Sequence, residues 1–319
     1  MSTLFSEFSG GKLKFSPMRL GALARREAFW GLLFLSPWLI GFLLWTVIPL
    51  VASLLFSFTN FNLIRPEAIE WIGLDNYIHF FRDPLVLNSA KVSLRFAAIA
   101  LPVAILHPIL MAALLKDKRL WARHLFNTLF YMPYIIPLVS TVYIWRGMLN
   151  EQTGWINLFL TQVGIAGPNW LNSTTWIYPA LVIINLWAAG NIIMFTLAAM
   201  QGVPTELYEA ARVDGAGRLH SFYHITLPLI TPIIFYNLII TMIGLAQYFI
   251  IPFVLNGGTG EPGHSTQFYA MQLFKEAFAY SNMGYGAAMA WVMFVFTLAV
   301  TALLFSTAKY WVFYSGEGR

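Results

Sequence analysis

Long apolar stretches alternate with shorter polar ones along most of this 319-residue chain. Six of the apolar stretches are long enough to cross about 30 Å of hydrocarbon as helices, which takes roughly 20 residues each. They are residues 30–58, 93–115, 126–148, 176–200, 232–255 and 287–308. The few charged residues inside them lie near their ends. The pattern predicts an all-α polytopic membrane protein with about six transmembrane helices.

The polar remainder defines the predicted domain organisation. Residues 1–29 are an N-terminal segment, residues 30–308 a transmembrane domain, and residues 309–319 a C-terminal tail. The first apolar stretch far exceeds the roughly 7 to 15 residues of a signal-peptide core, so it is expected to stay in the membrane. A polar interruption at residues 201–231 separates the fourth and fifth spans. We call residues 201–231 the signature loop.

Composition and charge predict how the chain is oriented in the membrane. The chain is 58% hydrophobic and only 10% charged, whereas soluble domains carry about 25% charged residues. Short loops rich in lysine and arginine stay in the cytoplasm. With the N-terminus inside, 13 of the 19 lysines and arginines fall on the inner side. Both termini and the signature loop are therefore expected to be cytoplasmic.

Several kinds of chemistry are not expected. The net charge is +5, but the basic residues are not interleaved with stacking aromatics, so no nucleic-acid partner is predicted. Cysteine is absent, and His220 and His224 have zinc-like spacing without the intervening glutamate or a nearby third ligand, so no metal site is predicted. No phosphate-binding G-x-x-x-x-G-K-[ST] motif occurs. We predict no catalytic residues and no enzymatic activity in this chain.

The signature loop has the pattern of a short helix. Thr205 is the expected N-cap, and Gly215 is expected to end the helix after Asp214 in the left-handed conformation. Leu207 shares one stripe of this helix with two alanines, which would let another surface approach closely. The residues expected to form that contact surface are Glu206, Glu209, Ala210, Ala211, Asp214 and Gly215.

The spacing within the loop resembles a family motif. Three residues separate Glu209, Ala210 and Ala211 from Gly215, and nine more separate Gly215 from I-x-L-P at residues 225–228. This is similar to the cytoplasmic signature of inner-membrane permeases of ATP-binding-cassette (ABC) importers. "FLSPWLIGFLLWTVIPLVASLLFSFTNF", "WIGLDNYIHFFRDP" and "NMGYGAAMAW" resemble the carbohydrate branch, and "KYWVFY" resembles its maltose-type first permease. "LNGGTGEPG" departs from the T-x-G-G-P often found in that branch.

The resemblance implies a fold, a function and a set of partners. The fold would be that of a type I ABC importer permease, in the cytoplasmic (inner) membrane of a prokaryote. The chain would move a sugar or oligosaccharide by alternating access, with the signature loop docked on the ATPase. The implied partners are two ATP-binding-cassette ATPase subunits, a second and non-identical permease, an extracytoplasmic solute-binding protein, the sugar and the lipid bilayer. ATP and Mg would be bound by the ATPase subunits, and this chain would hold no cofactor.

Polar residues inside the spans are candidates for the sugar pathway. A sugar needs amide and hydroxyl groups for its own hydroxyls and aromatic faces for its C–H surface, without fixed charge. On a continuous fifth helix, one face would hold Asn237, Thr241, Gly244 and Tyr248, with Gln247 one position off it. In the fourth span, Trp187 and Asn191 form a similar pair. The candidates are Trp187, Asn191, Asn237, Thr241, Gln247 and Tyr248. The alternative is that they serve only helix packing.

Other functions stay open at this stage. An ABC permease for a phosphate diester, a polyamine or an amino acid would share the signature loop. A stand-alone secondary transporter is less favoured, because ion-driven carriers usually keep acids or bases near the midplane and no Asp or Glu lies inside these spans. A membrane enzyme is disfavoured because the chain lacks a convincing catalytic constellation.

Overall fold

The structure is a computed structural model, and it describes residues 22–117 and 119–313. These residues contain helices and loops but no β-strand, and a single isolated bridge joins Thr59 and Trp71. The chain divides into two compact units at Ser53 and Leu54. The all-α prediction is confirmed.

In the N-terminal unit, the described residues form one long helix. Helix α1 (Ala22–Phe42) continues through a π-helical turn (Leu43–Val47) into α2 (Ile48–Phe56). An 18-residue segment within the helical stretch from Leu23 to Phe56 has a mean hydropathy of 2.4, and none of that segment is buried. A helix that is apolar on all sides needs a lipid or protein environment around it.

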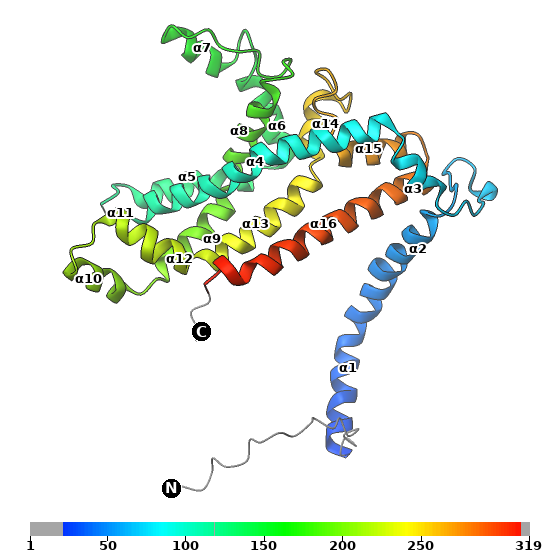
Figure 1. Cartoon of the computed structure of the whole chain (residues 1–319), viewed down its shortest axis with the longest axis horizontal. Helices are drawn as coiled ribbons and strands as arrows, with labels where there is room; N and C mark the ends of the chain where they lie inside the picture. Colours follow the sequence, from blue (N-terminus) through cyan, green and yellow to red (C-terminus); the bar gives the residue numbers. More distant parts are fainter. Residues whose placement is uncertain (1–21, 118, 314–319) are drawn as a thin grey trace. The chain divides into compact units, whose positions relative to one another are not determined.

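The second unit is built on three long helices. They are α4 (Pro84–Lys116), α13 (Thr231–Ala246) and α16 (Met283–Trp311). Helix α13 contacts both α4 and α16 (Figure 1), and α4 also packs along α9 (Gly190–Gln201). Buried apolar side chains fill these contacts, so the same residues that make each helix hydrophobic hold the bundle together.

The third and fourth spans are bent pairs of helices and not single continuous helices. Helices α5 (Arg123–Ile135) and α6 (Leu138–Met148) meet at 107°. Pro137 has no amide proton and holds the residue before it in an extended conformation, which ends α5. Helices α8 (Ile177–Trp187) and α9 meet at 56°.

The fifth span is also interrupted. Helix α13 ends at Ala246, and α14 (Ile250–Asn256) starts only after three non-helical residues, 247–249. The predicted helical face through Tyr248 is therefore wrong, because Tyr248 lies in the break. With each bent pair taken as one span, up to six helical segments in residues 22–117 and 119–313 are long and apolar enough to cross a membrane. Each of the six predicted apolar stretches overlaps one of them.

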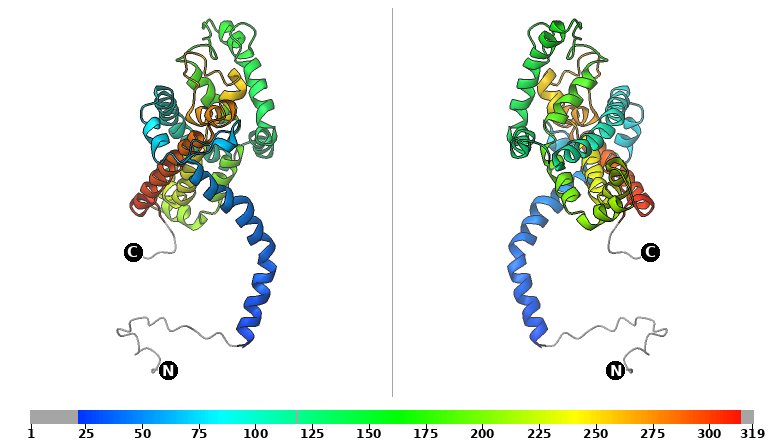
Figure 2. Two further views of the ribbon diagram at one scale, coloured as in Figure 1. Left: turned by 90° about the vertical axis from the view of Figure 1, so that its right-hand side faces the viewer. Right: turned by 90° about the vertical axis from the view of Figure 1, so that its left-hand side faces the viewer.

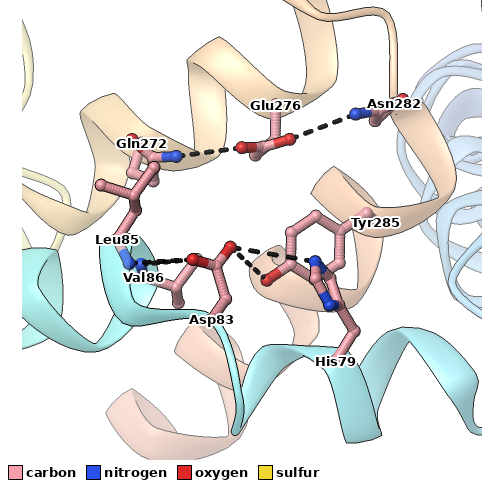
Figure 3. A network of polar contacts seen from close by, with 8 residues as sticks. All are labelled: His79, Asp83, Leu85, Val86, Gln272, Glu276, Asn282 and Tyr285. Carbon is pink, nitrogen blue, oxygen red and sulfur yellow. Dashed lines mark hydrogen bonds and ion pairs between the residues drawn. The ribbon is translucent and has the colours of Figure 1, made fainter.

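Short elements lie in the connections between the spans. They are a 3-10 turn (Pro66–Ala68), α3 (Asp75–Phe80), α7 (Trp155–Gln162), α15 (Tyr269–Phe274) and a π-helical turn (Lys275–Ala279). A polar network joins several of them (Figure 3). Asp83 caps the first turn of α4 and accepts a hydrogen bond from the Tyr285 hydroxyl at 3.1 Å. Glu276 accepts hydrogen bonds from the amides of Gln272 at 3.0 Å and Asn282 at 3.3 Å.

The signature loop lies at the opposite end of this unit, together with the C-terminal end of α16 (Figure 2). It contains α10 (Thr205–Val213), α11 (Arg218–Ser221), a π-helical turn (Phe222–Thr226) and α12 (Leu227–Leu229). The amide of Phe313, just after α16, donates to the Thr231 hydroxyl at 2.9 Å. The loop is thus a folded part of the unit and not a solvated connector.

Candidate functional site

Helix α10 starts one residue earlier than the sequence indicated. Pro204 occupies the N-cap position in an extended conformation, and Thr205 is already helical. No side-chain hydrogen bond caps this end, so the prediction of Thr205 as N-cap was wrong. Proline fits here because its fixed φ leads the chain into the helix. Glu206 lies in the first turn, where a carboxylate interacts favourably with the helix dipole.

The end of α10 is as predicted. Gly215 has φ of +79°, its amide donates to the carbonyl of Arg212 at 3.1 Å, and the Ala216 amide donates to the carbonyl of Ala211 at 2.8 Å. This pair of bonds is the Schellman motif. An added Cβ on Gly215 would meet no described atom within 4 Å. The glycine is therefore required for its backbone conformation and not for lack of space.

The outward surface of α10 is apolar and acidic. No residue of the helix, 205–213, is buried, and the side chains of Leu207 and Val213 are 42% and 88% exposed. Leu219, in α11, is 75% exposed. Of the predicted contact residues, Ala211 is half-buried and the others are exposed: Glu206, Glu209, Ala210, Asp214 and Gly215. Apolar side chains this exposed beside carboxylates suit contact with another protein.

The second half of the signature loop faces inward. Thr226 and Ile230 are buried, and the apolar side chains of residues 225–229 pack on a core that includes Leu115 and Met200. The I-x-L-P part of the motif therefore anchors the loop to the spans. The first half, residues 204–217, is mostly exposed.

His220 and His224 stack on one another, with ring centroids 4.0 Å apart. The Nδ1 of His224 lies 3.0 Å from the carbonyl oxygen of His220, so it acts as a donor to its own helix. Across the described ranges, no group of three or more His, Cys, Asp or Glu side chains is arranged to hold a metal ion.

One contact in this region has no sequence signal. The Nζ of Lys116 donates to the Tyr208 hydroxyl at 2.8 Å, and this hydroxyl lies 2.7 Å from the Thr226 Oγ1. Sequence reasoning missed it because Lys116 and Tyr208 are 92 positions apart. Only the folded chain brings them together.

Two pathway candidates are buried within the bundle. Asn237 is 5% exposed, and its amide donates to the Thr196 hydroxyl at 3.3 Å. Tyr248 is 8% exposed and stacks on Phe96. Its hydroxyl accepts a hydrogen bond from the side-chain amide of Asn185 at 2.8 Å. Asn185 was not among the residues predicted from the sequence. The polar groups of Asn237 and Tyr248 thus have hydrogen-bond partners within this chain.

The remaining candidates are more accessible. Gln247 is exposed at the break between α13 and α14, and Trp187, Asn191 and Thr241 are half-buried. The hydroxyl oxygen of Thr241 is itself buried. The ring of Trp187 makes an edge contact with Trp145, with centroids 5.9 Å apart. The Asn191 Oδ1 accepts from the amide of the next residue at 2.8 Å. Of these four, Gln247 is the most accessible.

Residues 94–311 match the family described as "Binding-protein-dependent transport system inner membrane component". The match covers well over half of the chain and includes the whole signature loop. The chain belongs to this family. The resemblance first indicated by Glu209, Ala210 and Ala211 is thereby confirmed, and this permease is an inner-membrane, multi-pass protein.

Relatives of this permease are themselves permease subunits and not enzymes. It is 37% identical over 303 residues to the probable ABC transporter permease YesP of Bacillus subtilis, which covers 94% of this chain and 97% of that protein. It is 31% identical to the arabinooligosaccharides transport system permease AraP of the same organism, over 85% and 86% of the two chains. It is 29% identical to the trehalose/maltose transport system permease MalF of Thermococcus litoralis, over 90% and 96%.

Solved structures agree on the fold. A chain of a bacterial ABC transporter that imports the acidic polysaccharide alginate superposes with a TM-score of 0.78 and 23% identity. The superposition covers 89% of this permease and 96% of that chain. This permease therefore has the type I ABC importer permease fold, as the sequence predicted.

Proposed function

We propose that this permease forms part of an ATP-driven importer that moves a sugar or oligosaccharide across the cytoplasmic membrane by alternating access. It works with a second, non-identical permease and receives the solute from an extracytoplasmic binding protein. Two ATPase subunits bind ATP and Mg. The names of its relatives, which include permeases for arabinooligosaccharides and for trehalose and maltose, support a carbohydrate over other solutes.

The exposed surface of α10 carries this proposal. A helix of nine residues is too short to be stable alone, yet it is kept folded with Leu207, Ala210 and Val213 turned outward. Glu209 lies among them and supplies charge that a basic surface on the partner would complement. We assign the surface formed by α10 to contact with the ATPase. The charge distribution of the chain supports a cytoplasmic position for it.

The break in the fifth span supports the pathway part of the proposal. Non-helical backbone at membrane depth is tolerated only where protein covers it or where it lines a water-filled cavity. Gln247 lies in such a break and is exposed, so a partner subunit or the solute pathway must cover it. Gln247, Asn191 and Trp187 are the pathway residues accessible in this conformation. Asn237, Thr241 and Tyr248 would join them only if the helices around them separate.

Two variants of α10 test the docking role. Glu209→Lys reverses the charge of the exposed surface, and Gly215→Val costs about 1 to 2 kcal/mol in the left-handed conformation or breaks the turn. Both lie outside the spans, so both proteins are expected to insert normally. We expect each to hold the ATPase more weakly in co-purification and to lose stimulation of ATP hydrolysis by the sugar-loaded binding protein.

The outcome that would overturn the docking role is also clear. Normal ATPase retention together with full stimulation in both variants would leave α10 without a coupling function. The solute class is tested separately, by thermal-shift screening of the cognate binding protein against a sugar library. Stabilisation by amino acids or polyamines, and by no sugar, would replace the carbohydrate assignment.

A further inference from the structure

The C-terminal end of α4 contacts α10 through the side chain of Tyr208. The Tyr208 ring is half-buried and packs on the apolar core beneath the signature loop. Lys116, the last residue of α4, donates to its hydroxyl at 2.8 Å and lies 4.5 Å from its ring centroid. An ammonium group can only donate, so the Tyr208 oxygen is the acceptor and the hydroxyl proton is available to Thr226, 2.7 Å away.

This hydroxyl joins three elements that are far apart in the chain. Lys116 belongs to α4, Tyr208 to α10, and Thr226 ends the π-helical turn that leads through α12 into α13. Thr226 is 4% exposed, so its end of the contact is shielded from water. Hydrogen bonds that involve a charged group and are partly buried are stronger than exposed ones.

A second link runs beside it. The Asp117 carboxylate, next to Lys116, lies 3.5 Å from the Arg218 guanidinium in α11. Both side chains are substantially exposed, at 44% and 70%, so this ion pair contributes little to stability. The Tyr208 contact is therefore the main polar connection between the end of α4 and the signature loop.

Apart from the chain on either side of it, helix α10 reaches the core beneath it through Tyr208. None of its nine residues is buried, and its outward face belongs to the proposed ATPase contact. A partner that pulls on α10 would tilt it about its ends unless its inner face is fixed. Helix α4 packs along both α9 and α13, so a rigid joint at Lys116 would pass movement of α10 to the bundle.

We propose that Tyr208 is the positioning residue that joins α10 rigidly to α4 and to the base of α13. It makes the signature loop and the spans move as one body when the ATPase closes. The inference rests on the proposed function, because it assigns the internal side of the same coupling surface. The hydroxyl group of Tyr208, and not its ring, makes this connection.

The test follows movement across the membrane without the solute. The permease has no cysteine, so a single Gln152→Cys in the exposed loop between α6 and α7 can carry an environment-sensitive fluorophore. In the complete transporter, addition of MgATP is expected to change its fluorescence. Tyr208→Phe keeps the ring and removes both hydrogen bonds. We expect it to lower the MgATP-induced change about fivefold while basal ATP hydrolysis and ATPase co-purification stay normal.

Matched variants separate a joint from a general loss of stability. Lys116→Met keeps the length of the side chain and is expected to cause the same loss, with no further loss in the double variant, because both remove one shared interaction. Tyr223→Phe is the control: this tyrosine of the same loop is 60% exposed, and its hydroxyl has no hydrogen bond to the described residues. It should respond to MgATP like the parent protein.

The results that would overturn the inference differ from those that would overturn the proposed function. A full fluorescence change in Tyr208→Phe, or additive losses in the double variant, excludes the joint even if Gly215→Val uncouples. Intact coupling in both Glu209→Lys and Gly215→Val removes the proposed docking role of α10. If Tyr208→Phe inserts poorly, Thr226→Val decides by the same measurement, since it removes the buried partner of the hydroxyl.

Discussion

At the scale of single residues, the polar groups inside the spans fall into two environments. Asn237 is covered by α9 and hydrogen-bonded to Thr196, whose hydroxyl also donates to the carbonyl of Ile192 at 2.8 Å. Gln247 lies just after the end of α13, in the same span, and is exposed. Amide side chains ten positions apart in one span therefore have different roles: one joins two helices, and the other is available to a partner or a solute.

This difference predicts different effects of the same substitution. Gln247→Leu is expected to lower solute uptake several-fold without lowering the temperature of thermal unfolding, because it removes an accessible amide and no internal contact. Asn237→Leu is expected to act through stability, with a cost of about 0.6 kcal/mol, the average for a hydrogen bond between membrane helices. Uptake and thermal unfolding of the two purified, reconstituted variants measure this. Unchanged uptake in Gln247→Leu would remove it from the pathway.

At the scale of elements, close helix contacts depend on particular glycines. Gly190 starts α9 where it crosses α5, and an added Cβ would meet the carbonyl oxygen of Phe130 and approach the Cα of Tyr131 to 3.0 Å. Gly244, inside α13, has no described atom within 4 Å of the same position. The two glycines look alike in the sequence, yet only the first is required by a crossing.

Alanine at these two positions is expected to have opposite effects. Gly190→Ala must push α9 away from α5, and overpacking of this kind costs about 1 to 3 kcal/mol. Gly244→Ala adds a better helix former in open space and is expected to be neutral or to stabilise by less than about 1 kcal/mol. Thermal unfolding of the detergent-purified proteins compares them. Equal stability of the two variants would mean that α5 and α9 do not cross this closely.

At the scale of the whole molecule, orientation in the membrane remains a prediction from charge. The signature loop and the loops around α7 and α15 lie at opposite ends of the second unit (Figure 2). The count of lysines and arginines along the whole sequence predicts that the signature loop is on the inner side, which the positive-inside rule places in the cytoplasm. The ATPase, being cytoplasmic, would meet α10 only in this orientation.

Single cysteines test the orientation directly. Gln152→Cys and His220→Cys replace exposed side chains at the two ends of the unit in a chain that has no other cysteine. An impermeant thiol reagent added to intact cells, or to spheroplasts where an outer membrane is present, is expected to label the first variant. It should label the second only after the membrane is opened. The reverse pattern would invert the topology and separate α10 from a cytoplasmic partner.

The sequence by itself determined the features that depend on local energetics. The apolar stretches indicate helices in a membrane because hydrocarbon excludes charge and unpaired backbone groups. The end of α10 at Gly215 followed in the same way, because the left-handed conformation is costly for any residue with a Cβ. The Glu-Ala-Ala spacing then indicated the family before any packing was known.

The tertiary structure decided everything that depends on which helices meet. Pro137 interrupts the third span, but the 107° angle between α5 and α6 depends on packing around them. Asn237 and Gln247 are both polar positions in one apolar span, and only the position of α9 makes the first buried and leaves the second exposed. Lys116 and Tyr208 pair across 92 positions, because hydrogen bonding depends on distance in space, which sequence spacing specifies only within a single helix or strand.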